Sequence, residues 1–465
     1  MTSVIRRGPK SLISRLVGGI GATALGPIVT SAIQLGSVPL LLHAWGPSKY
    51  GDWLLLSAVP SYLSFSGLGF GDSSASEMTM LVAAGDRKGA LACFQSSWLL
   101  LSGISAGVLV AVAASVWWVH WQAILHLAGV TNGQAAQIIL ALSIWILCGQ
   151  QSNVFESGYR CDGNFAFGNL GSTFQRLTEA VVGTIMGIAT GSLLAVAWSY
   201  VACRVLGLVS YRLVLMRFSP WLKLGLHQAS IAVVRKMLKP SLGIVVMLIG
   251  SAVTLQGFTL LVGVVLGPIA VTAFSTARTM TRVGTQMIGA LSNGIWPELS
   301  SAFGAGDLPL ARKLHRHAYQ ASLILSVCCA AFLWLLGPTF YQLWVRKSVV
   351  LEVPAFHILL LVTIANSLWY TSAIVQVSAN KHFRLAVTFL VAAIASCALG
   401  YMLTQRFGLD GAASALLLNE IVMCAFVLRK SLRQMQDTPG AFLRAVFGST
   451  PYVLRPLLAN RGPRR

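Results

Sequence analysis

The stretch Gln34–Trp53 reads QLGSVPLLLHAWGPSKYGDW, and it occurs a second time, much altered, as LQGFTLLVGVVLGPIAVTAF over Leu255–Phe274, at an offset of 221 residues. In each copy an apolar run ends at a Gly-Pro pair, Gly46-Pro47 in the first and Gly267-Pro268 in the second. Gly-Pro pairs mark turns between periodic segments. The two copies therefore predict an internal repeat in which a helix, a tight turn and a second helix recur.

The same offset aligns further unusual positions without a gap. The matches place Gly36 on Gly257, Trp53 on Phe274, Glu77 on Glu298, Ala84-Gly85-Asp86 on Ala305-Gly306-Asp307, and Ala90 on Ala311. Identity outside these positions is low, and chance matches among apolar residues carry little information. The matched positions are turns, loop residues and an acid, where chance agreement is least expected. We therefore predict two related halves.

The composition is that of a membrane protein. Of 465 residues, 55% are hydrophobic and 10% are charged, and the mean hydropathy is +0.73; soluble domains carry roughly 25% charged residues. Apolar runs of about 20 residues or more cross a ~30 Å hydrocarbon core, and they do so as helices. The period-2 pattern of a membrane barrel is absent. Twelve membrane helices are predicted, near 16–43, 52–70, 90–119, 135–157, 165–189, 192–216, 241–266, 268–297, 314–337, 355–379, 384–405 and 410–430.

The repeat and the helix count together predict the domain organisation. A first six-helix bundle is expected over 1–216 and a second over 241–431, both entering the membrane from the same side, which makes the repeat parallel. Residues 217–240 are expected to form a basic amphipathic linker on the membrane surface, and residues 432–465 a basic tail. Both segments suit electrostatic anchoring to anionic lipids.

The charge distribution predicts the orientation. The net charge is +21, and nothing in the sequence resembles a nucleic-acid-binding module. With the N-terminus inside, the predicted cytoplasmic segments hold 27 Lys and Arg against 4 on the other side, so both termini are expected in the cytoplasm. The eight cysteines lie in or beside apolar runs without a CxxC. Neither disulfides, a metal site nor a cofactor is expected.

At this point the sequence resembles a known family. Gln34–Trp53, the run from Leu63 to Gly71, and the segment Trp296-Pro297-Glu298 to Ala305-Gly306-Asp307 are similar to polysaccharide flippases of the multidrug/oligosaccharidyl-lipid/polysaccharide exporter superfamily. The resemblance implies two six-helix bundles and a bacterial inner-membrane location. It also implies that an undecaprenyl-pyrophosphate-linked oligosaccharide is moved between leaflets. Gly67-Leu-Gly-Phe-Gly71 lacks a preceding strand and is no nucleotide-binding loop.

Ionisable residues at membrane depth are costly and usually functional. Arg278 and Arg282 are four residues apart in the predicted eighth helix, so they share one face. Arg278 is expected near the midplane, and a guanidinium is suited to phosphate oxygens. A substrate-binding role competes with pairing to a carboxylate or with snorkelling, which is credible for Arg282.

Other polar residues in predicted helices are also candidates. Arg176 is a candidate substrate ligand, or a partner of Glu179 three residues on, which would make a structural ion pair. Glu179 and Glu420 are the predicted proton-coupling acids, since a desolvated carboxylate can take up a proton near neutrality.

Three further candidates have other expected roles. Gln34 is expected to face substrate or to make polar contacts between helices. Glu77 and Glu298 lie near cytoplasmic helix ends in both halves, where a gating or structural role is expected.

These features predict a flippase that works by alternating access, driven by a proton or sodium gradient. The nearest alternative is a multidrug or other small-molecule cation-coupled exporter of the same superfamily, whose cavity would be dominated by acids. A membrane enzyme would need a sizeable external loop with catalytic groups, and the expected external loops are short, so an enzyme is not expected.

Overall fold

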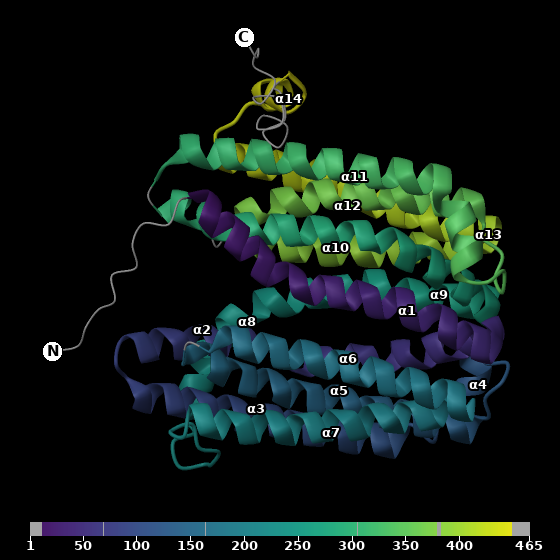
Figure 1. Ribbon diagram of the computed structural model, residues 1–465, viewed down its shortest axis with the longest axis horizontal. Helices are drawn as coiled ribbons and strands as arrows, with labels where there is room; N and C mark the ends of the chain where they lie inside the picture. Colours follow the sequence, from purple (N-terminus) through teal and green to yellow (C-terminus); the bar gives the residue numbers. More distant parts are fainter. Residues whose placement is uncertain (1–11, 68, 163, 305, 379–382, 449–465) are drawn as a thin grey trace, which may run out of the picture.

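The computed structural model describes residues 12–67, 69–162, 164–304, 306–378 and 383–448 (Figure 1). Every regular element in these ranges is a helix. The first half contains α1 (Leu12–Ser61), η1 (Tyr62–Gly67), α2 (Phe70–Ala83), α3 (Arg87–Ser115), α4 (Trp121–Ile124), α5 (Asn132–Cys161), α6 (Phe165–Thr190) and α7 (Leu193–Phe218). The second contains α8 (Ile231–Ala252), η2 (Val253–Gly257), α9 (Phe258–Leu266), α10 (Pro268–Gly304), α11 (Leu308–Trp344), α12 (Val353–Ser378), α13 (Phe383–Gln434) and α14 (Pro439–Gly448).

These helices make an all-α integral membrane protein of about twelve crossings. Eight helices in the described ranges are long and apolar enough to span a membrane. Two of them contain two crossings each, because α1 bends at Gly46 and α13 bends at Gly408. The amphipathic α6 and α10 complete the set. The predicted fold class is confirmed.

The helices form two bundles that lie one above the other in Figure 1. The first bundle is α1–α7 and the second is α8–α13. Two elements connect them, since α1 packs against both α6 and α10, and α8 packs against both α2 and α13. The junction of α9 and α10, which contains Gly267, lies at the right of Figure 1, and the α1 bend at Gly46 contacts it through Pro47; this end is called the Gly46 end. The turns at Gly85 and Gly306 lie at the other, the Gly85 end.

The backbone confirms the predicted repeat at its turns. Gly46 has φ 75° and ψ 168°, and its counterpart Gly267 has φ 84° and ψ 178°. Positive φ of this kind is available almost only to glycine. At the other end Asp86 caps α3 by accepting from the Gly89 amide at 2.8 Å. Asp307 caps α11 in the same way, from the Leu310 amide at 2.9 Å.

The segment between the bundles differs from the expected surface helix over 217–240. Residues 219–230 are not helical, and α8 begins at Ile231 and runs on toward the membrane. The irregular part is held on α3, where Gln95 Nε2 donates to the Lys223 carbonyl at 3.0 Å and Gln95 Oε1 accepts from the Gln228 amide at 2.9 Å. The Gln95 side chain supplies hydrogen-bond partners for backbone groups of the linker. These groups therefore do not depend on helical hydrogen bonds within the linker.

Two sequence-based expectations change with this fold. Arg204, which was counted among the cytoplasmic positive residues, lies within α7, eleven residues from its start at Leu193. The basic tail contains a helix, α14, that packs against α11; residues 449–465 of the tail lie outside the described residues.

Candidate functional site

The two copies of the repeat close the Gly46 end by touching each other. Thr272 Oγ1 donates to the Pro47 carbonyl at 2.7 Å. Gly51 packs so tightly that an added Cβ would lie 2.1 Å from the Pro268 carbonyl oxygen. At the 221-residue offset Gly51 corresponds to Thr272, and Pro47 corresponds to Pro268. The first position of the first copy thus contacts the second position of the second copy, and the reverse contact is also made. Such a reciprocal contact is typical of two elements related by a two-fold axis.

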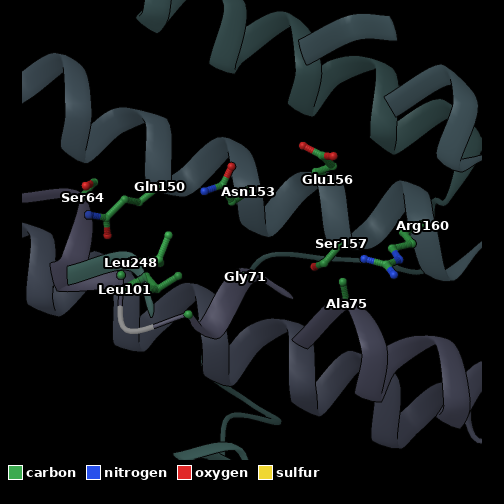
Figure 2. Close-up of a pocket in the computed structure, with 12 residues that line it drawn as sticks. Ser64, Gly71, Ala75, Leu101, Gln150, Asn153, Glu156, Ser157, Arg160 and Leu248 are labelled. Carbon is green, nitrogen blue, oxygen red and sulfur yellow. The ribbon is translucent and has the colours of Figure 1, made fainter. Parts of the chain in front are cut away.

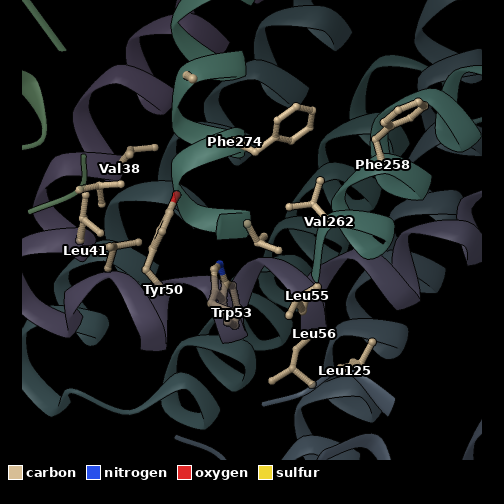
Figure 3. Close-up of a cluster of buried hydrophobic side chains, with 14 of the residues drawn as sticks. Val38, Leu41, Tyr50, Trp53, Leu55, Leu56, Leu125, Phe258, Val262 and Phe274 are labelled. Carbon is tan, nitrogen blue, oxygen red and sulfur yellow. The ribbon is translucent and has the colours of Figure 1, made fainter. Parts of the chain in front are cut away.

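A dense apolar cluster lies behind this contact (Figure 3). It joins Trp53 and Leu55 of α1 to Phe258 and Val262 of α9 and Phe274 of α10, all of them buried. Trp53 and Phe274, which the repeat aligned, both belong to it. Buried side chains from both bundles pack against one another here, so the cluster closes the route between the bundles at this end.

Arg278 lies one helical turn beyond Phe274. Its guanidinium carbon is 5.1 Å from the centre of the Phe274 ring, and Nη2 donates to Thr259 Oγ1 at 2.7 Å. Nη1 is buried, and no described residue supplies it with a hydrogen-bond acceptor. Arg282 follows one turn later and is partly buried. The two guanidinium groups therefore lie on the side of the apolar cluster that faces the Gly85 end.

Neither arginine has a counter-charge among the described side chains. The ion pairs found there join Arg204 to Glu179, Lys236 to Glu77, and Arg316 to Asp437. The competing expectation, in which Arg278 and Arg282 pair with carboxylates, therefore finds no support in the described part of the chain. A buried cation without a partner is expensive. An anionic ligand that pairs with the guanidinium groups would offset that cost of desolvation.

Gln34 makes the polar inter-helix contact that was one of its two expected roles. Gln286 Nε2 of α10 donates to Gln34 Oε1 at 3.3 Å, and Ser31 Oγ donates to Gln286 Oε1. Trp344 of α11 donates to the Leu35 carbonyl at 2.7 Å. The first helix of the first bundle is thus hydrogen-bonded to the second bundle, by groups that polar solvent or a ligand could replace.

Glu179 pairs with a residue that the sequence analysis did not propose. Arg204 Nη2 of α7 donates to Glu179 Oε2 at 2.8 Å, while Trp145 Nε1 and Gln175 Nε2 each donate to the same carboxylate at 3.2 Å. The expected pairing of Arg176 with Glu179 is wrong, because Arg176 is exposed and donates to Thr173 Oγ1 instead. The sequence did contain a signal for Arg204. It is a charged residue twelve positions after the start of the apolar helix predicted over 192–216.

Glu420 lies in the core of the second bundle with neutral partners. It accepts hydrogen bonds from Asn366 Nδ2 at 2.9 Å, from Asn419 Nδ2 at 3.1 Å and from Trp369 Nε1. The residue is 4% exposed, and no described cation pairs with it. Its environment thus differs in kind from that of Glu179, although both acids occupy membrane helices.

A polar pocket of about 190 Å³ lies in the first bundle where its second crossing is interrupted (Figure 2). Gln150 of α5 holds the interruption by donating to the Leu63 carbonyl and to Ser66 Oγ, both at 2.9 Å. A Cβ at Gly67 would lie 3.0 Å from Gln150 Oε1, so glycine permits this approach. Irregular backbone in a membrane protein is tolerated where it lines a cavity. Ser64, Asn153, Glu156, Ser157 and Arg160 give the pocket its polar lining.

This pocket was not predicted from the sequence. The signal was the run of polar residues Gln150, Gln151 and Asn153 within an otherwise apolar helix. The pocket lies next to the second bundle, because Leu248 of α8 contributes to its wall. Nearby, the irregular segments of the two bundles approach each other: a Cβ at Gly257 of η2 would lie 3.6 Å from the Tyr62 hydroxyl of η1.

Glu77, predicted to gate or brace the structure, forms an ion pair at the Gly85 end. Its Oε1 accepts from Lys236 Nζ at 2.6 Å and ties α2 to the start of α8. The Glu77 carboxylate raises the pKa of Lys236 above its ordinary value, so Lys236 is charged at neutral pH. The side chain of its repeat partner Glu298 lies outside the described part of the chain.

We expect Glu77→Gln to release the first turns of α8. Amide exchange over 231–237 should become several-fold faster in the variant at low salt. Because the Lys236 side chain is 69% exposed, 1 M salt should bring the wild type close to the variant. Hydrogen–deuterium exchange in detergent measures both. If the two proteins exchange equally at low salt, the pair does not restrain α8.

Comparison with solved structures identifies proteins of similar fold. No family model matches the sequence, and no curated protein matches it. An inward-facing structure of a multidrug resistance MATE family transporter of the MOP superfamily is similar, with a TM-score of 0.75 at 12% identity, covering 90% of this chain and 98% of the other. The MATE multidrug transporter DinF-BH in complex with R6G has a TM-score of 0.70 at 15% identity, covering 97% and 100%.

A third neighbour is described differently. It is a MOP superfamily transporter from Pyrococcus furiosus, described as having a binding pocket of reverse polarity that suggests a different function. Its TM-score is 0.66 at 12% identity, covering 91% of this chain and 95% of the other. At these identities the likeness concerns the fold. The chain is a multi-pass membrane protein with the two-bundle fold of these transporters.

Proposed function

We propose that this protein is an alternating-access exporter of small amphipathic molecules rather than an enzyme. The observation that carries the proposal is the reciprocal contact between Gly51–Pro268 and Thr272–Pro47. It closes one end of the interface between two repeat-related bundles and has buried polar groups behind it. Rocking of the two bundles about that interface would open this end and close the other. The neighbours described as multidrug transporters support this class of function.

The second candidate function is a flippase for an anionic lipid-linked oligosaccharide. A specific observation favours it: Arg278 and Arg282 lie beside each other without a described counter-charge, and Nη1 of Arg278 has no acceptor among the described residues. A pyrophosphate would supply that acceptor and two charges. The neighbour described as having a pocket of reverse polarity supports the view that this fold accommodates different substrate charges. Gln34 and Arg176 are proposed as further substrate contacts.

For coupling, we propose Glu420 as the proton-binding acid. The described residues that donate to it are all neutral, so gaining or losing a proton there breaks no described ion pair. Glu179 is the second proposed acid, and its titration would have to be linked to the Arg204 contact. A sodium gradient remains the alternative driving force. The proposed location is the bacterial inner membrane, with both termini cytoplasmic.

The test is transport by the purified protein in liposomes under a proton gradient. One assay follows a fluorescent undecaprenyl-pyrophosphate oligosaccharide between leaflets, and the other follows efflux of a cationic dye. We expect Arg278→Ala to slow movement of the anionic substrate by about 10- to 150-fold, since a hydrogen bond to a charged group contributes ~1.5–3 kcal/mol. Arg278→Lys should retain part of the activity, and the exposed Lys88→Ala should retain all of it.

The outcomes separate the two functions. Movement of the oligosaccharide that depends on Arg278 supports the flippase, and dye efflux that does not depend on Arg278 supports the small-molecule exporter. Transport of neither substrate class under proton or sodium gradients would contradict both.

A further inference from the structure

The chain after α13 folds back and clasps α11. Arg312 Nε donates to the Met435 carbonyl at 2.7 Å. Arg316 donates twice to Asp437, from Nε to Oδ2 at 2.9 Å and from Nη2 to Oδ1 at 2.6 Å. Both arginines thus hold the segment that leads into α14. Residues 435–448 are called the tail clasp below.

Two contacts attach α14, the helix of the tail clasp, to α11. Phe442 is buried and stacks on His315 with ring centres 5.4 Å apart. Gln320 Nε2 donates to the Val446 carbonyl at 2.8 Å. Phe442 and Val446 are four residues apart, so one face of α14 is fixed to α11. The tail clasp is therefore packed against the second bundle and belongs to it.

A cavity of about 370 Å³ lies between α11 and α14. Its lining is Pro309, Arg312, Lys313, Arg316, His317 and Ala445. Every titratable side chain in that lining is basic. The carboxylate beside it, Asp437, already accepts two hydrogen bonds from Arg316. The cavity is thus a cationic site of a size that holds a phosphate group.

The cavity lies where the membrane surface is expected. α11 has 37 residues, about 55 Å at 1.5 Å per residue, which exceeds the ~30 Å hydrocarbon core. Its charged residues Arg312, Lys313 and Arg316 precede a long uncharged stretch that begins after His317. This places the cavity at headgroup level, at the Gly85 end of the molecule.

The outer face of α14 is apolar, and no described residue covers it. Leu443 is 51% exposed and Phe447 is 72% exposed, and they lie four residues apart on one face. Figure 1 shows α14 nearly end-on, whereas α11 runs across the view. A short helix that lies across the bundle at headgroup level, with exposed apolar side chains and Arg444 beside them, is typical of the membrane interface.

The first bundle shows that a clasp of this kind needs no cations. Gln95 and Ser96 of α3 hold residues 219–230 through neutral hydrogen bonds. At the 221-residue offset these positions correspond to Arg316 and His317. The charge of Arg316 is matched by Asp437 within the clasp. Lys313, which corresponds to the uncharged Ala92 of the first bundle, carries a positive charge that none of these clasp contacts uses, so its charge calls for another explanation.

We propose that the cavity between α11 and α14 binds the phosphate headgroup of an anionic phospholipid from the adjacent leaflet. Arg312 and Lys313 supply charge to the phosphate, while Leu443 and Phe447 lie among the acyl chains. Charge complementarity and the headgroup-level position select a lipid as occupant. This inference does not depend on which molecule the protein transports.

The experiment is native mass spectrometry of the intact protein in detergent, titrated with phosphatidylglycerol or with phosphatidylcholine. We expect phosphatidylglycerol to bind at least tenfold more tightly. Arg312→Gln/Lys313→Gln should weaken that binding about 25-fold, a factor of about five for each charge. Lys313→Gln alone, which leaves the Arg312–Met435 bond in place, should weaken it about fivefold.

A matched control removes two charges at the Gly85 end of the molecule, one from α3 and one from α8. Lys88→Gln/Arg235→Gln changes exposed residues and should leave phosphatidylglycerol affinity within about twofold. Equal binding of the two lipids, or an equal loss in the control variant, would overturn the proposal. So would displacement of the lipid by millimolar inorganic phosphate, because the site would then belong to a soluble anion.

Discussion

Substituting Gly51 by alanine is expected to open the Gly46 end of the molecule. The new Cβ would lie 2.1 Å from the Pro268 carbonyl oxygen, whereas non-bonded carbon contacts need about 3.5 Å. The α1 backbone is helical at this position, so alanine itself causes no strain within the helix. Relief must come from separation of the two bundles. Overpacking of this kind costs ~1–3 kcal/mol, which corresponds to about a 5- to 150-fold shift toward the conformation open at this end.

Spin labels at His43 and Ile269, both exposed, would report the separation as a distance distribution in a cysteine-free background. The population at longer distance should grow in Gly51→Ala. Gly36→Ala is the matched control, because it lies in the same element and its added Cβ would meet nothing within 4 Å. An unchanged distribution in Gly51→Ala would show that this contact does not hold the end closed.

Removing Arg204 is expected to destabilise the first bundle more than any change to an exposed charge. The Glu179 carboxylate would stay buried, with a 5% exposed side chain, and would keep only Trp145 and Gln175 as donors. Breaking a buried ion pair from one side costs ~3–5 kcal/mol. Arg204 also covers the Trp145 ring at 5.1 Å, so packing is lost as well. Unfolding by titration with sodium dodecyl sulfate in mixed micelles measures the loss.

The double variant Glu179→Leu/Arg204→Met should lose much less than Arg204→Ala, since apolar residues of similar volume replace both charges. Arg176→Ala, on the same helix as Glu179 but exposed, should stay within ~0.5 kcal/mol of the wild type. Similar small losses for Arg204→Ala and Arg176→Ala would mean that the pair contributes little.

Polar contacts between helices were the least predictable part of the site. Sequence spacing favoured Arg176 as the partner of Glu179, because residues three apart share a helix face. The actual partner, Arg204, comes from the neighbouring helix α7 and competes successfully because it reaches the carboxylate from the bundle interior. The polar run that contains Gln150 did not indicate its partners, since Leu63 and Ser66 are more than eighty residues away in sequence.

The sequence by itself determined the membrane class, the crossings and the repeat, because these depend on local properties. Long apolar runs must be helical in lipid, and Gly46, Gly267, Asp86 and Asp307 specify turns and caps through their own backbone and side-chain chemistry. Only the tertiary structure decided which charges meet, as for Glu179 and Arg204, and which have no described counter-charge, as for Arg278. It also decided that α14 folds onto α11, since helix packing depends on the shape of surfaces that are far apart in sequence.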